Sequence, residues 1–302
     1  MRKSLSRRIL ERYQLYLILL PTFLFIGIFV YEPMYGRIIA FKDFKPFLGI
    51  LGSKWVGLKH FIRFFNAPSF WRLIGNTVGL SVYQLVAGFP IPIMLALAMN
   101  MVPARRFKKT VQMVTYAPHF ISTVVLVGML SVFLSKNYGL ANHLLASLGF
   151  ERVFFLGKPQ YFQSLYVWSG IWQNAGWGSI IYLAALSAID PQLHEAALVD
   201  GASLWQRVIH IDIPGILPTV VILLILNAGR IMSVGFEKAY LMQNALNLEK
   251  SEIIATYVYK MGLLNAQYSF AAAVGLFNAV INFTLIILVN RLAKLLGQVG
   301  LW

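Results

Sequence analysis

The residue types that most often carry out chemistry are sparse in this sequence. It has no cysteine, which excludes thiol nucleophiles, disulfides and cysteine zinc sites. It also has no Gly-x-x-x-x-Gly-Lys-Ser/Thr phosphate loop and no His-Glu-x-x-His metal motif. We therefore expect no catalytic residue, metal or cofactor in this chain. Structural roles are expected for the dispersed histidines His60, His119, His143, His194 and His210.

The most informative spacing lies in the charged segment 190–212. Asp190 and the proline after it predict a helix start, because the carboxylate caps free amides and proline has no donor to leave unpaired. Gly201 stands where a left-handed stop is favoured, and Ser203 with Gln206 has the spacing of a capping box. The segment is predicted to be a compact pair of short helices on which a partner docks.

The same segment contains a longer pattern: Glu-Ala-Ala, three residues, Gly, nine residues, Ile, one residue, an aliphatic residue and Pro. It resembles the EAA loop of bacterial ATP-binding-cassette (ABC) importer permeases, with Ile213 in place of the usual leucine. In that family the loop is a coupling helix, which transmits movement of the ATP-binding subunits to the membrane helices. The resemblance assigns this role to Glu195, Ala196, Ala197, Gly201, Ile211 and Pro214.

The likeness extends over nearly the whole chain. The basic start, the apolar layout and Gly-Phe-Glu-Lys-Ala-Tyr at 235–240 resemble the carbohydrate-importer permeases, and within them the oligo- and polysaccharide branch. This implies a bacterial cytoplasmic (inner) membrane location, a second related permease subunit and an extracellular or periplasmic solute-binding protein. It also implies two separate ATP-binding subunits, which bind ATP and magnesium.

Polar and aromatic side chains inside the apolar runs are candidates for a sugar path, because amides bind hydroxyls and rings stack on sugar faces. They are Trp172, Gln173, Asn174, Trp177, Tyr182, Asn227, Asn278 and Asn282. The alternative is that Asn and Gln join neighbouring membrane helices by hydrogen bonds. Arg230 has three possible partners: the membrane interface, Glu237, or an acidic group of the solute.

These residues must be positioned by membrane helices. The sequence is 58% hydrophobic and 12% charged, whereas soluble domains are typically about 25% charged. Runs without Asp, Glu, Lys or Arg approach or exceed the roughly 20 residues that a membrane-spanning helix needs. We therefore predict an all-α membrane protein, with one permease domain over 1–302. Its six expected spans are 13–31, 73–101, 110–135, 161–189, 213–235 and 268–290, with prolines kinking several of them.

Orientation rests on clustered positive charge, because the numbers of Lys and Arg on the two sides are nearly balanced. Tight clusters lie in the N-terminal tail 1–12 and at 105–109, close to spans. The positive-inside rule then places both termini and the coupling loop in the cytoplasm. The net charge of +15 is accordingly attributed to topology and lipid contact rather than to nucleic-acid binding.

The first outer loop is basic, with Lys42, Lys45, Lys54, Lys59 and Arg63. Within it, Leu58, Phe61, Ile62 and Phe65 have helical spacing and predict a short helix with one apolar face. The loop either anchors on the membrane surface or attracts an anionic solute or acidic partner. Under the second alternative, we expect the oligosaccharide to carry carboxylates.

Two other functions share some of these features. An ABC permease for a non-sugar solute would share the coupling loop. A secondary transporter or channel normally has ionisable residues in mid-membrane, and the expected spans contain almost none. The coupling loop and this scarcity favour the importer.

Overall fold

The structure, a computed structural model, describes residues 13–295, 297 and 300. Its elements are almost all helices, as predicted. The chain separates into two compact units: one runs up to Ala67 and includes Val258–Phe277, and the other contains Pro68–Tyr257 and the part from Asn278 onward. The basic tail 1–12, used above for orientation, lies outside the described residues.

The first unit begins with a long apolar helical segment. α2 (Tyr13–Ile26), a π-helical turn (Gly27–Tyr31), α3 (Glu32–Gly36) and a 3-10 turn (Arg37–Phe41) together make a candidate span of 29 residues. The helix thus continues past the predicted end at residue 31. Pro33 lies in the first turn of α3, where a backbone N–H would have no acceptor within α3, so proline removes no hydrogen bond of that helix.

A small sheet and a short helix follow in this unit. β1 (Lys42–Asp43) pairs antiparallel with β2 (Lys54–Trp55), and α4 (Gly49–Gly52) lies between them in the sequence. α5 (Lys59–Phe65) confirms the predicted outer-loop helix. Its buried residues are His60 and Phe64, whereas the predicted apolar face is largely exposed. The Phe64 ring packs edge-on against the rings of Phe270 and Phe277.

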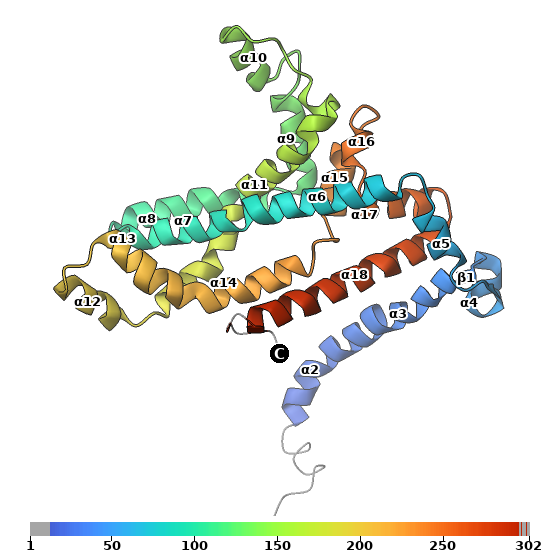
Figure 1. Cartoon of the computed structure of the whole chain (residues 1–302), viewed down its shortest axis with the longest axis horizontal. Coiled ribbons are helices and arrows are strands. Elements are labelled where there is room, and N and C mark those ends of the chain that lie inside the picture. Colours follow the sequence, from blue (N-terminus) through green and yellow to red (C-terminus); the bar gives the residue numbers. More distant parts are fainter. Residues whose placement is uncertain (1–12, 296, 298–299, 301–302) are drawn as a thin grey trace, which may run out of the picture. The chain divides into compact units, whose positions relative to one another are not determined.

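The second unit begins with one long helix in two parts. α6 (Phe70–Gly88) and α7 (Pro90–Met101) form a single candidate span of 32 residues and follow one line in Figure 1. Phe89, between them, keeps helical backbone angles. Pro90 and Pro92 therefore do not break this helix.

The predicted third span, 110–135, is wrong as a continuous helix. α8 (Arg105–Tyr116) passes through a 3-10 turn (Ala117–Phe120) to α9 (Thr123–Phe133), and the two helices are bent by 98°. Pro118 lies in the turn and lacks a backbone donor. Ser122 then caps the new helix by accepting a hydrogen bond from the Val125 amide at 3.3 Å. Local capping thus starts a second helix in a new direction.

α11 (Pro159–Ser187) is the central helix of the second unit and packs against α6, α7, α8 and α14 (Ile213–Ala228). One end of α11 contributes Phe162, Tyr166 and Val167 to an apolar core. The other end contributes Tyr182, Leu183 and Leu186 to a second core. The remaining elements of this unit are α10 (Leu140–Ser147), α12 (Pro191–Val199), α13 (Leu204–Arg207), α15 (Phe236–Met242) and α16 (Leu248–Ser251). α17 (Ile254–Tyr259) and α18 (Tyr268–Leu295) contain residues of both units.

Among the described residues, four helical segments are long and apolar enough to cross a membrane, and the bent α8–α9 pair would be a fifth. Six were expected. α11 accounts for the difference: its 29 residues contain no Asp, Glu, Lys or Arg, but its Gln, Asn and Ser residues lower its hydropathy. The α14 helix ends at Ala228, short of the predicted 235, and α18 continues past 290 to Leu295.

Candidate functional site

The predicted coupling segment, residues 190–212, has the local geometry that its sequence predicts. The Asp190 side chain accepts a hydrogen bond from the Gln192 amide at 3.0 Å and begins α12. Gly201 has φ +76°, and the Ala202 amide bonds back to the Ala197 carbonyl at 2.8 Å. These contacts confirm the predicted helix start and left-handed stop.

The second short helix is held by the predicted capping box. The Ser203 amide donates to the Gln206 side chain at 2.7 Å, and the Gln206 amide donates to the Ser203 hydroxyl at 3.4 Å. A π-helical turn (Val208–Asp212) then leads into α14, with Pro214 in its first turn. The loop is thus joined to a candidate span by continuous helical structure.

α12 presents its surface to solvent. Glu195 and Ala196 are exposed, Ala197 is half-buried, and no residue of the helix is buried. Leu193, Leu198 and Val199 add exposed apolar surface, with Val199 at 88%. Apolar area concentrated on one short exposed helix is typical of a docking surface.

A buried polar cluster connects α12 to the rest of the unit. The Asp212 carboxylate is 3.3 Å from His194 Nε2, and the Asn100 amide donates to it at 3.4 Å. Asp212 itself is 3% exposed. From the sequence, only a structural role was predicted for His194, and Asp212 and Asn100 were not among the predicted site residues. Asp212 could have been recognised from the sequence, because a carboxylate directly before an apolar run needs polar partners.

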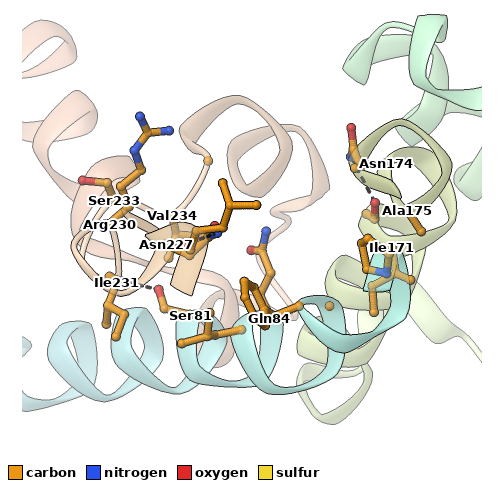
Figure 2. Close-up of a pocket in the computed structure, with 18 of the residues that line it drawn as sticks. Ser81, Gln84, Ile171, Asn174, Ala175, Asn227, Arg230, Ile231, Ser233 and Val234 are labelled. Carbon is orange, nitrogen blue, oxygen red and sulfur yellow. Dashed lines mark hydrogen bonds between the residues drawn. The ribbon is translucent and has the colours of Figure 1, made fainter. Parts of the chain in front are cut away.

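A cavity of about 510 Å³ lies among α6, α7, α11 and the end of α14. Four of the predicted path residues line it: Asn174, Tyr182, Asn227 and Arg230. Sequence analysis missed Ser81, Gln84 and Ser233, which also line it. Figure 2 shows Gln84 of α6 between the segment that carries Asn227 and the helix that carries Asn174.

The other predicted path residues do not line this cavity. Asn282 accepts from the Met232 amide at 3.0 Å and donates to the Ser233 hydroxyl at 2.7 Å, so it joins two segments by hydrogen bonds. Trp177 stacks on His119, with ring centroids 4.6 Å apart. Trp172 is half-exposed, and the side-chain oxygen of Asn278 is buried without a hydrogen bond among the described residues.

Arg230 is exposed and lines the cavity. Among the described residues it has no carboxylate within ion-pair distance, and Glu237 is not its partner. Asn174 is held by two contacts: it donates to the Gly170 carbonyl at 3.0 Å, and its side-chain oxygen lies 3.0 Å from His119 Nδ1. The cavity therefore combines oriented amides with an arginine available to an anion.

Residues 88–298 match the family described as binding-protein-dependent transport system inner membrane component. The chain belongs to this family. It is 47% identical over 301 residues to the polygalacturonan/rhamnogalacturonan transport system permease protein YteP of Bacillus subtilis (strain 168), covering 100% of this chain and 94% of that protein.

Two solved structures are also similar. A crystal structure of a bacterial alginate ABC transporter, in complex with an alginate pentasaccharide-bound periplasmic protein, matches with TM-score 0.90 and 40% identity, covering 98% of this chain and 99% of that one. A crystal structure of a bacterial ABC transporter involved in the import of the acidic polysaccharide alginate matches with TM-score 0.88 and 41% identity, covering 96% and 98%.

These findings confirm the predicted resemblance to importer permeases and the all-α membrane fold. The chain is a multi-pass inner membrane component of a binding-protein-dependent importer, in a family of transport proteins rather than enzymes.

Proposed function

We propose that this permease passes an acidic oligosaccharide from an extracytoplasmic binding protein to the cytoplasm, driven by ATP hydrolysis in separate subunits. The solute class is supported by the relatives, whose names state transport of polygalacturonan/rhamnogalacturonan and of alginate. The path is assigned to the cavity among α6, α7, α11 and α14.

The observation that carries the acidic assignment is the chemistry of the cavity lining. Among the described residues that line the cavity, Arg230 is the one charged residue and there is no carboxylate. A guanidinium binds a carboxylate through two parallel hydrogen bonds. Gln84, Asn174 and Asn227 supply amide donors and acceptors for sugar hydroxyls.

The energy source is assigned to partners that dock on α12. Its exposed apolar residues suit the cleft of an ATP-binding subunit, and the exposed Glu195 suits a cation of that subunit. The complete importer then has this chain, a second permease, two subunits that bind ATP and magnesium, and the solute-binding protein. In this proposal the chain itself has no catalytic residue, metal or cofactor, contacts membrane lipid but no nucleic acid, and keeps both termini in the cytoplasm.

Exchange of the cavity arginine tests the solute class. The complete importer, reconstituted in vesicles with its binding protein, should take up an oligogalacturonate in preference to a neutral oligosaccharide of the same length. Arg230→Gln should reduce this preference by about tenfold, because it removes a charge-assisted contact worth about 1.5 kcal/mol or more. Uptake of each labelled sugar measures the effect.

Arg152→Gln is the matched control. Arg152 is exposed, donates to the Asn137 carbonyl at 3.2 Å and does not line the cavity. Its variant should keep the parent's preference. Equal uptake of both sugars by the parent, or an Arg230→Gln variant that discriminates like the parent, would contradict the acidic assignment.

A further inference from the structure

Lys238 of α15 is a buried ammonium group held by α11. The residue is 8% exposed, and its Nζ donates to the Tyr166 carbonyl at 2.7 Å. The same Nζ lies 4.7 Å from the centre of the Tyr166 ring, a cation–π distance. Tyr166 is in turn fixed, because its hydroxyl donates to the Gly235 carbonyl at 3.3 Å.

Among the described residues, Lys238 has no carboxylate within ion-pair distance. Burying a charge without an opposite charge is costly, and an apolar side chain of similar length would avoid that cost. Burial lowers the pKa of Lys238 to about 8, so the Lys238 side chain is still mostly protonated at neutral pH. Fold stability alone therefore gives no reason for a lysine here.

The position of Nζ relative to the cavity supplies a reason. Gly170 and Gly235 both line the cavity. A Cβ atom built on Gly170 would lie 3.2 Å from Lys238 Nζ. The ammonium thus lies next to Gly170, a lining residue without a side chain, although Lys238 itself does not line the cavity.

We infer that Lys238 is a specificity-determining residue, which favours an anionic solute by its positive charge next to Gly170. It acts together with Arg230, which is one of the residues that line the cavity. A charge in a poorly solvated wall is weakly screened, so its field extends into the adjoining space. A hydrogen bond to the Tyr166 carbonyl and a cation–π contact with the Tyr166 ring hold the ammonium in place without cancelling its charge. The inference rests on the proposed acidic solute.

The test compares Lys238→Met, which keeps an apolar stem and removes the charge, with Lys238→Arg, which keeps the charge. The complete importer is reconstituted with each variant, and oligogalacturonate and a neutral oligosaccharide of equal length compete for uptake. We expect Lys238→Met to lower the preference for the acidic sugar by about tenfold, with neutral uptake retained, and Lys238→Arg to stay near the parent. Lys250→Met, the same change at an exposed lysine of α16, should have no effect.

Thermal unfolding of the purified complex separates a structural role from a role in specificity. Lys238→Met should melt no lower than the parent, since it removes an uncompensated buried charge. A Lys238→Met variant that fails to assemble, melts at a lower temperature than the parent, or loses uptake of both sugars equally would overturn the inference. A parent with a clear acidic preference that Lys238→Met retains would overturn the Lys238 assignment alone. A parent without that preference would overturn the proposed solute class as well.

Discussion

Gly201 shows how one residue sets the shape of the coupling segment. Its φ of +76° lies in the left-handed region, which costs residues other than glycine roughly 1–2 kcal/mol. A Cβ atom built there would meet nothing within 4 Å, so a larger side chain has room. Any penalty at this position is therefore conformational rather than steric.

The conformational penalty at Gly201 can be tested by substitution. Gly201→Val should weaken the turn after α12 by about 1–2 kcal/mol and lower the solute imported per ATP hydrolysed, because β-branched residues strongly disfavour positive φ. Gly201→Asn should stay closer to the parent, since asparagine adopts this conformation more readily. Uptake and ATPase rates measured on the same vesicles give the number of solute molecules imported per ATP hydrolysed. A Val variant with the parent's ratio would refute the coupling role of the turn.

α12 is a short helix with no buried residue of its own. One link to the unit is His194, which contacts Asp212 at the base of α14, while Asn100 of α7 donates to the same carboxylate. In the proposed importer, this buried carboxylate passes a movement of α12 to both long helices.

Asp212→Asn should weaken this link with little change in volume. A hydrogen bond to a charged group contributes about 1.5–3 kcal/mol, more than a neutral one. We expect import per ATP to fall by roughly threefold to tenfold while the complex still assembles. Asp200→Asn is the control, because Asp200 lies in the same loop but is exposed. Unchanged import per ATP in Asp212→Asn would mean that α12 is coupled by another route.

The proposed orientation in the membrane connects the cavity and the predicted coupling segment to different partners. In this proposal the binding protein delivers solute from outside, whereas ATP-binding subunits act from the cytoplasm. The absence of cysteine makes this orientation directly measurable, since any introduced thiol is the single one in the chain.

We predict that a membrane-impermeant thiol reagent labels Lys54→Cys in intact cells and labels Phe107→Cys only after permeabilisation. Both positions are exposed, so accessibility within the chain is not limiting. Lys54 lies in the predicted outer loop, and Phe107 lies in the basic cluster expected inside. Labelling of Phe107→Cys in intact cells would reverse the proposed topology.

Features that depend on local interactions could be predicted from the amino-acid sequence alone. The cap at Asp190, the stop at Gly201 and the capping box at Ser203 involve residues a few positions apart, so spacing was enough to predict them. The all-α membrane fold followed from apolar runs, because lipid leaves few alternatives to helices.

Which polar residues line the cavity and which join helices depends on tertiary contacts. Asn227 and Asn282 have the same side chain in similar apolar runs, yet Asn227 lines the cavity and Asn282 bonds to Met232 and Ser233. The role of Lys238 likewise depends on Gly170, far away in the sequence. Contacts between distant segments set these roles, and hydropathy or spacing within one segment carries no information about them.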